Sequence, residues 1–499
     1  MKNIYSESLK YIKNHRKEII LLISYFIIIA SISAILFKNY ESKVMISGGN
    51  PEYLNLSRNL LEHGAFSSSK TKPLKIISSR TPGYPLFLSI LRILPGNFLF
   101  YFIILQSLLT TIGLLFIFKL TKKITSYKWT PYLAATLYGF DIYTVVQTSY
   151  AMTEVLYTPL LIIGAYYFIE FLDKKRKKEV ALSGLFFGLS SLVRPTSLYL
   201  IFFIPIIYFL FQTTLNRQKI FQECKKSLIF IAIFGAIIFP WFLRNKIVFN
   251  NFKLTSLSPH ALNVNYLLDI YAKKYNTSTN KAKEIMINNV LKKGKENIKN
   301  FDKKWENRFS FKLSKYYNHQ AKKTFLQYPW LTIKSNLFGV TLDFFLSSGY
   351  KNIAQNLTNS KAGNKITGRR LFKLLKTGKI RKIIILLNNN NNLINITFLA
   401  GLFLSSLYLI LLIINTLWDI KILLTNKKYQ QNKTALKEIF LLSIILYHAG
   451  LTGSFARGRF RFPVLGFIII FALIGLEKVI LFLKKNKQCH NATKIKKRD

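Results

Sequence analysis

The segment from Arg80 to Pro85 reads Arg-Thr-Pro-Gly-Tyr-Pro and lies between two long apolar runs. Pro82 and Pro85 restrict the backbone, and Gly83 allows it to turn, so the segment can hold one permanent cation at a membrane surface. A guanidinium held there suits a phosphate group, because its planar fork donates paired hydrogen bonds. The same residues would also fit an ordinary loop-to-helix turn whose Arg reaches the interface.

Arginine recurs at the ends of later apolar runs. Each of these positions falls on the same side as Arg80 if every apolar run crosses the membrane once. Four separate loops then present Arg at one face, which indicates an anionic ligand such as a lipid-linked phosphate or pyrophosphate. The positions are Arg194, in Arg194-Pro195; Arg244, with Asn245 in Pro-Trp-Phe-Leu-Arg-Asn; and Arg457, Arg459 and Arg461 in one late turn.

Carboxylates are scarce, and general-base chemistry needs one. The acids expected near the same face are Glu52, Glu62, Asp141 and Glu154. Glu52 opens an expected helix, where it could accept a proton or simply favour the helix N-terminus. Glu154 stands where a span begins, and an acid there is costly unless it is used or paired. A helix cap, or a partner for Arg194 or Arg80, is the structural alternative for Glu154.

Apolar runs near 20 residues long recur and are long enough to span hydrocarbon as helices. The sequence therefore predicts an all-α, polytopic integral membrane protein with about 10 transmembrane helices (range 9–13) and external amphipathic helices. The expected spans lie near 19–37, 98–118, 129–140, 155–171, 180–193, 197–212, 227–243, 394–417, 438–450 and 464–483.

The chain is strongly basic, with 72 Lys and Arg against 21 Asp and Glu. The cations are spread over many short loops, which favours membrane lipids as the counter-surface and argues against nucleic acid. Their distribution places the N-terminus, several short loops and the tail in the cytoplasm. Residues 38–97, 244–393 and 452–463 are then external.

Three parts are expected on this basis. Residues 1–243 form an N-terminal transmembrane catalytic module that includes the external loop 38–97. Residues 244–393 form a long external loop, and residues 394–499 form the last transmembrane helices with a basic cytoplasmic tail. The long loop shows apolar residues at helical spacing, which predicts amphipathic helices broken near Gly294, lying on the membrane or on the protein itself. Residues 331–347 are apolar enough to span, but Lys334 and Asp343 favour an interfacial or re-entrant helix.

Several classes of function find no support in the sequence. It contains no Walker-type loop, no Gly-x-Gly-x-x-Gly and no Cys/His cluster, so ATP-driven transport and nucleotide-fold catalysis are unsupported. Cys224 and Cys489 are far apart in segments assigned to the cytoplasm, which predicts no disulfide.

Taken in order, these motifs resemble the C-type glycosyltransferase fold, in particular bacterial relatives of the protein O-mannosyltransferases and the aminoarabinose transferase of lipid A. The resemblance covers most of the chain. It rests on an acidic first loop followed by five motifs, which here are Arg80 to Pro85, Thr153-Glu154, Arg194-Pro195, Pro240 to Asn245, and Arg457 to Pro463.

The resemblance implies an inverting enzyme that takes a sugar from a polyprenyl-phosphate carrier. It implies a catalytic carboxylate, here Glu52 or Glu154, because the family's usual Asp is replaced at Gly49 or Asn50. It implies lipid-phosphate or donor binding by Arg80, Tyr84, Arg194, Arg244, Asn245, Arg457, Arg459 and Arg461. Some relatives hold a divalent metal, for which His260 and Glu52 are conceivable ligands, but no metal is assigned.

The function expected from the sequence is transfer of a sugar to a lipid, glycan or protein acceptor on the outer face of a bacterial cytoplasmic membrane. Two alternatives stay open. A flippase or transporter of a lipid-linked sugar would use the same arginines without a base. A degenerate, non-catalytic homologue would explain the missing Asp.

Overall fold

The computed structural model describes residues 16–43, 51–210, 217–298, 309–345, 392–425, 433–453 and 460–495. These parts of the chain are helices joined by turns, with one isolated antiparallel bridge between Ser67 and Ile76. The predicted all-α, polytopic fold is confirmed.

Seven helices in the described parts are long and apolar enough to cross a membrane. They are α2 (Arg16–Lys43), α5 (Phe98–Ile124), α8 (Thr153–Lys174), α11 (Arg217–Phe249), α20 (Asn392–Thr425), α21 (Lys433–Thr452) and α22 (Phe462–Ile495).

The other three expected spans fall on shorter helices. They are α6 (Thr130–Gly139), α9 (Lys177–Val193) and α10 (Leu200–Leu210), of 10, 17 and 11 residues. A ten-residue helix is only about 15 Å long, roughly half the thickness of the hydrocarbon core. Every expected span therefore lies on a helix, but α6 and α10 are too short to cross alone in a straight line.

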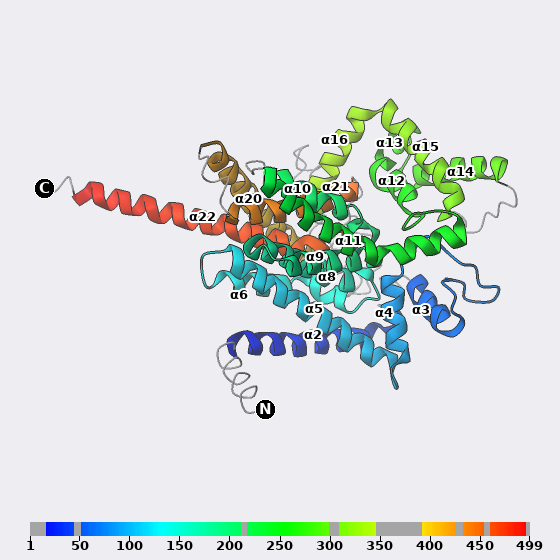
Figure 1. Ribbon diagram of the computed structural model, residues 1–499, viewed down its shortest axis with the longest axis horizontal. Helices are drawn as coiled ribbons and strands as arrows, with labels where there is room; N and C mark the ends of the chain where they lie inside the picture. The colour runs from blue at the N-terminus through cyan, green and yellow to red at the C-terminus, as the bar shows by residue number, and fades with distance from the viewer. Residues whose placement is uncertain are drawn as a thin grey trace.

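The core of the bundle is built around α8 and α22. Helix α8 packs against α5 and α9, α9 packs against α11, and α22 packs against α20 and α21. The stretch from Val464 to Ile474 of α22 is buried, and Gly466 brings this helix close to Ile117 of α5. Helix α22 then extends beyond the bundle toward the C-terminus (Figure 1).

Ion pairs gather at one end of the bundle. Glu18 of α2 pairs with Lys122 of α5 at 3.1 Å. Asp173 of α8 pairs with Lys437 of α21 at 2.7 Å and with Lys123 of α5 at 3.6 Å. The segments that the charge bias assigns to one side of the membrane therefore lie together at one end.

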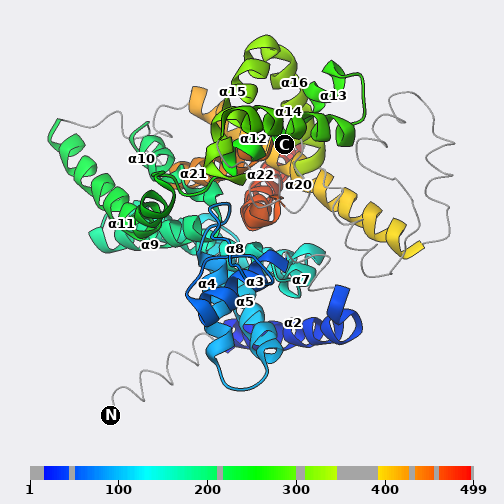
Figure 2. The ribbon, with the colours of Figure 1, turned by 90° about the vertical axis from the view of Figure 1, so that its right-hand side faces the viewer.

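Helices α12–α16 form a separate group beside the bundle in both views (Figures 1 and 2). They are α12 (Ser258–Tyr266), α13 (Leu268–Lys274), α14 (Thr279–Asn297), α15 (Phe311–Gln327) and α16 (Pro329–Gly339). The group has its own hydrophobic core, which includes Tyr271, Met286, Val290 and Tyr317. The amphipathic face of α14 thus packs on the protein itself.

Two expectations for the long loop can be compared with these helices. Helix α14 runs through Gly294, which is buried within it, and ends three residues later at Asn297, close to the expected break. The stretch 331–347 overlaps α16, whose 11 residues begin at Pro329, and the π-helix that follows at Val340–Phe345. Trp330 and Leu337 of α16 are 73% and 66% exposed, which suits an interfacial helix better than a buried one.

Candidate functional site

The loops that carry the predicted arginines meet at the end of the bundle away from the ion pairs. Thr255 donates a hydrogen bond to the Ser79 carbonyl at 2.9 Å, and the hydroxyls of Ser78 and Ser256 are 2.8 Å apart. Thr81 donates to the Val193 carbonyl at 2.9 Å. The residues on both sides of Arg80 are therefore bonded to two distant parts of the chain.

Gly83 explains why the Arg80 turn can lie so close to α9. It is the first residue of α4 (Gly83–Ile93), and a Cβ there would stand 2.8 Å from the Leu192 carbonyl oxygen. Only a glycine fits this approach without displacing backbone atoms. Because Leu192 and Val193 end α9, the contact brings Arg80 and Arg194 into one region.

Arg80 holds the first candidate carboxylate. Its Nε and Nη2 atoms donate to Glu52 Oε2 at 2.9 and 2.7 Å. Glu52 lies in the first turn of α3 (Pro51–His63), and its side chain is 17% exposed. The Arg80 guanidinium also lies 5.4 Å from the ring centre of Tyr53. Burial alone would lower the pKa of Arg80, but Tyr53 and Glu52 outweigh it and raise that pKa, so the cation is permanent.

Tyr84 packs against Tyr53, next to the Arg80–Glu52 pair. It is fully buried, its ring meets that of Tyr53 edge to face at 5.4 Å, and its hydroxyl donates to Gln106 Oε1 at 3.2 Å. Gln106 in turn donates to the Thr148 carbonyl at 2.8 Å, at the end of α7 (Ile142–Thr148). Burial leaves Tyr84 without an exposed surface for a donor, so its geometry suits support of Tyr53.

Arg194 holds the second candidate carboxylate. Its Nη1 lies 2.5 Å from Glu154 Oε1 and donates to Thr153 Oγ1 at 3.3 Å. Thr153 donates to Glu154 Oε2 at 3.0 Å, and the Glu154 side chain is 2% exposed. Of the alternatives that the sequence left open for Glu154, a partnership with Arg194 is the one that these contacts show.

The late Arg-rich turn reaches the same place. Arg194 lies between the rings of Tyr157 and Phe460, at 5.6 and 5.8 Å from their centres. Arg461 follows Phe460 but is buried, and its Nη1 donates to the Phe345 carbonyl at 3.1 Å and to Ser405 Oγ at 2.7 Å. Arg457 and Arg459 lie outside the described residues.

Arg244 differs from the other arginines. Its guanidinium lies near the rings of Phe66, Trp241 and Phe249, at 5.4, 4.7 and 5.0 Å from their centres. Its Nη1 donates to the Ile77 carbonyl at 3.1 Å and to Asn245 Oδ1 at 2.7 Å. Among the described residues it makes no ion pair with a carboxylate. An aromatic wall and a cation without a counter-charge suit an anionic ligand.

Asn245 has a supporting place. Its Nδ2 donates to the carbonyls of Lys253 and Leu254 at 2.8 and 3.1 Å. Its oxygen accepts the hydrogen bond from Arg244, so this amide is fully occupied in holding the Arg244 side chain.

The other acids lie elsewhere. Glu62 is largely exposed near the end of α3, beside His63. Asp141 caps α7 by accepting from the Tyr143 backbone amide at 2.9 Å. Glu52 and Glu154, which pair with Arg80 and Arg194, therefore stay the candidate bases.

The conceivable metal ligands do not form a donor cluster. His260 lies edge-on to the rings of Phe309 and Tyr317, at 4.7 and 5.2 Å between ring centres. Burial, helped by the charge of Lys283, lowers the pKa of His260 to about 4. In the described parts of the chain, no three His, Cys, Asp or Glu side chains gather as a metal site. The described side chains therefore do not fit a metal ion.

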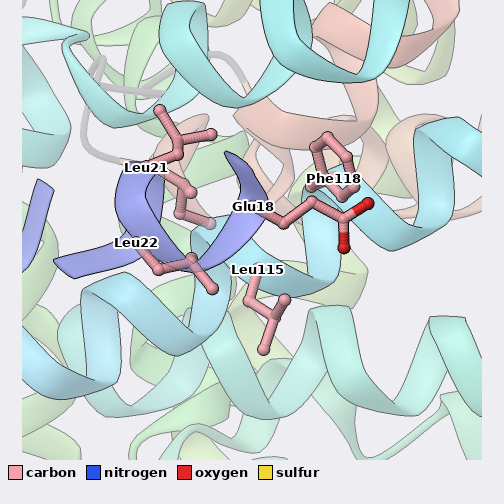
Figure 3. A pocket seen from close by; sticks show the side chains of 6 residues that line it. Glu18, Leu21, Leu22, Leu115 and Phe118 are labelled. Carbon is pink, nitrogen blue, oxygen red and sulfur yellow. The ribbon is translucent and has the colours of Figure 1, made fainter. Parts of the chain in front are cut away.

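A small hollow lies between α2 and α5, far from these residues (Figure 3). Glu18, Leu21, Leu22, Leu114, Leu115 and Phe118 line it. Phe118 is twelve residues along α5 from Gln106, which corresponds to about 18 Å of helix. The hollow is therefore separate from the candidate site.

The arrangement offers two oriented carboxylates at one end of the bundle, together with Arg244, which makes no ion pair within the described parts of the chain. Such groups can accept a proton and stabilise an anion. The part that the sequence did not predict is the aromatic support, namely Tyr53 beside Arg80 and Tyr157 beside Arg194. Only the adjacency of Tyr53 to Glu52 gave a signal for it.

Residues 79–243 match the family described as dolichyl-phosphate-mannose-protein mannosyltransferase. The match contains the motifs at Arg80, Glu154 and Arg194, and it ends one residue before Arg244. About a third of the chain is therefore similar to a family of membrane glycosyltransferases, and the matched segment runs from the Arg80 turn to the late part of α11.

Two solved structures are similar to this chain. One is the archaeal oligosaccharyltransferase AglB from Archaeoglobus fulgidus in complex with an inhibitory peptide and a dolichol-phosphate, with 12% identity and a TM-score of 0.42. The alignment covers 95% of this chain and 52% of AglB, so the chain spans about half the length of that protein. The other is ArnT from Cupriavidus metallidurans bound to undecaprenyl phosphate, with 11% identity, a TM-score of 0.37, and coverage of 92% and 78%. No curated protein sequence matches the chain.

Proposed function

We propose that this protein is a glycosyltransferase, which moves a sugar from a polyprenyl-phosphate carrier to a hydroxyl of a lipid, glycan or protein acceptor. One observation supports the proposal most strongly. Glu52 is paired with Arg80 and Glu154 with Arg194, whereas Arg244 makes no ion pair with a carboxylate among the described residues. The family match supports the same reaction class. The site is proposed to face outward from a bacterial cytoplasmic membrane, opposite the basic loops.

The proposed base is Glu52. A general base must reach the proton that it removes, and the Glu52 side chain is 17% exposed, whereas that of Glu154 is 2% exposed. Arg80 fixes the direction of the Glu52 carboxylate. Glu154 is assigned the role of holding Arg194, although it remains the alternative base.

The proposed step is an inverting displacement. The Glu52 carboxylate accepts the proton of the acceptor hydroxyl, while the oxygen of that hydroxyl bonds to the anomeric carbon. The bond from that carbon to the phosphate oxygen breaks on the opposite face, and the polyprenyl phosphate leaves with the electron pair. Arg244 is assigned to the departing phosphate, because a fixed cation there stabilises the charge that develops.

The remaining predicted donor-binding residues take supporting or open roles in this proposal. Tyr84 and Asn245 hold Tyr53 and Arg244 respectively, and Arg461 holds the late turn against Ser405. The predicted contacts of Arg457 and Arg459 with the lipid phosphate stay predictions.

The decisive experiment compares Glu52→Gln with Glu154→Gln in transfer from a radiolabelled polyprenyl-phosphate sugar. Glu52→Gln keeps the size and hydrogen bonding of the side chain but cannot take the proton, so transfer should fall by roughly 10²–10⁴-fold. Binding of the donor should persist, because Arg244 is unchanged. Glu62→Gln, at the exposed end of the same helix, is the matched control and should behave as wild type.

Each outcome has a distinct meaning. A larger loss in Glu154→Gln than in Glu52→Gln would move the base to Glu154. Full activity in both variants would remove the carboxylate mechanism. A wild-type protein that moves the lipid between leaflets without transferring sugar would replace the enzyme with a transporter.

A further inference from the structure

A buried polar network lies under Arg194 and joins three separate segments. The Tyr157 hydroxyl of α8 is 2.8 Å from His448 Nε2 of α21 and 2.8 Å from Ser197 Oγ of the turn Pro195–Ser197. Thr196 Oγ1 donates to the same hydroxyl at 3.1 Å. The oxygen of Tyr157 thus has three polar neighbours and is fully buried.

The hydrogen positions in this network follow from one contact. His448 Nδ1 lies 3.0 Å from the Ile444 carbonyl oxygen, which can only accept. Nδ1 therefore carries a proton, and a neutral imidazole with that tautomer must accept at Nε2. The Tyr157 hydroxyl then donates to His448. Its lone pairs accept from Ser197 and Thr196, so every group is satisfied.

The network controls the surroundings of Arg194. The centre of the Tyr157 ring lies 5.6 Å from the Arg194 guanidinium. Tyr447, next to His448 on α21, donates to the Thr196 carbonyl at 2.6 Å. One turn of α21 thus fixes both the ring against which Arg194 rests and the backbone that follows Arg194.

We propose that His448 is a positioning residue, which orients Tyr157 and through it the Arg194–Glu154 pair. The inference rests on the proposed function for its effect on catalysis, and it assigns a role to the C-terminal helices. Helix α21 lies outside the matched residues 79–243. The donation from Tyr157 makes its oxygen more electron-rich, which strengthens the attraction between the ring and Arg194.

Nuclear magnetic resonance of the imidazole nitrogens tests the network without any activity measurement. The full-length protein in detergent is labelled with ¹⁵N-histidine, and the His448 signals are assigned by their loss in His448→Gln. The expected result is a neutral ring with its proton on Nδ1. Tyr157→Phe should move the Nε2 resonance, because that nitrogen loses its donor. A proton on Nε2, or no response to Tyr157→Phe, would overturn the proposal.

Steady-state kinetics tests the consequence for the site. His448→Phe and Tyr157→Phe should each lower kcat by roughly 10- to 100-fold with little change in the KM for donor, as expected for misplacement of a group. The double variant should lose no more than the larger single loss, because both changes break one contact. His448→Gln should retain most activity, since its carbonyl oxygen can accept from Tyr157.

The controls are a matched pair away from the site. Tyr166→Phe removes a hydroxyl that donates to Glu170 at the ion-paired end, and His319→Phe changes an exposed histidine of α15. Both should behave as wild type. Additive losses in the double variant, or wild-type kinetics for His448→Phe, would overturn the positioning role. Absence of transfer by the wild-type protein would instead reject the proposed function, and the resonance experiment would still decide the network.

Discussion

At the scale of single residues, the arginines of the site differ in the groups that surround their charge. Arg80 and Arg194 each hold a carboxylate at 2.7 and 2.5 Å, whereas Arg244 has aromatic rings, a carbonyl and an amide oxygen around it. A bound phosphate gains most from a cation whose charge is not already compensated. Replacement of each of the three arginines should therefore affect donor binding and turnover differently.

Arg244→Ala should mainly weaken the binding of polyprenyl phosphate, while Arg80→Ala should mainly lower turnover. Loss of Arg80 leaves Glu52 without its orienting partner, and removal of a charge-assisted contact that matters in the transition state costs about 2–4 kcal/mol. The measurement is donor titration combined with transfer kinetics. Arg176→Ala, an exposed arginine before α9, is the control. Equal KM and kcat for Arg80→Ala and wild type would remove Arg80 from the site.

At the scale of elements, the approach of α4 to the end of α9 decides whether the two halves of the site meet. Gly83 lies at the start of α4, and the atoms it faces are the Leu192 carbonyl and a methyl group of Val193. A carbonyl oxygen cannot move aside as a flexible side chain can. The absence of a side chain at Gly83 therefore allows the turn that contains Arg80 to pack against the end of α9.

Gly83→Ala should lower both transfer activity and thermal stability, because its Cβ would lie 2.8 Å from the Leu192 oxygen. Overpacking of this kind costs about 1–3 kcal/mol. Melting temperature in detergent and transfer rate are the two readouts. Gly235→Ala in α11 is the control, since nothing lies within 4 Å of its added Cβ and alanine favours a helix. Unchanged stability and activity in Gly83→Ala would contradict the close packing.

At the scale of the whole molecule, the contacts between loops show that the loops lie in two groups at opposite ends of the helix bundle. The basic loops meet around Asp173 and Glu18, and the arginine loops meet around Thr81 and Thr255. The late turn joins the second group, because the ring of Phe460 lies against Arg194. The charge bias then assigns the first end to the cytoplasm.

Cysteines placed at exposed positions should report the two sides directly. In a background with Cys224 and Cys489 replaced by serine, Lys70→Cys and Asn280→Cys should react with an impermeant thiol reagent in intact cells. Lys128→Cys and Lys177→Cys should react only after the membrane is opened; all four positions are exposed. Labelling of Lys128→Cys in intact cells would reverse the assigned orientation.

The sequence by itself determined the fold class, the places of the helices and the arginine-bearing turns. These depend on local properties, because a run of apolar residues must form a helix in a membrane and a Pro-Gly segment must turn. Every expected span lies on a helix for this reason. The ordered motifs likewise sufficed to indicate the superfamily, since each is a short contiguous stretch.

The tertiary structure decided which side chains meet. Arg80 and Glu52 are 28 positions apart, and Tyr157 and His448 are 291 apart, so no local pattern pairs them. The sequence left Glu154 as a base, a cap or a partner of either arginine, and packing of α8 on α9 gave it Arg194. It also left open whether the amphipathic helices of the long loop lie on the membrane or on the protein, and α14 buries its apolar face in a core of helices α12–α16. These pairings depend on how the helices pack, because a contact between distant segments contributes free energy only when the fold brings the two segments together.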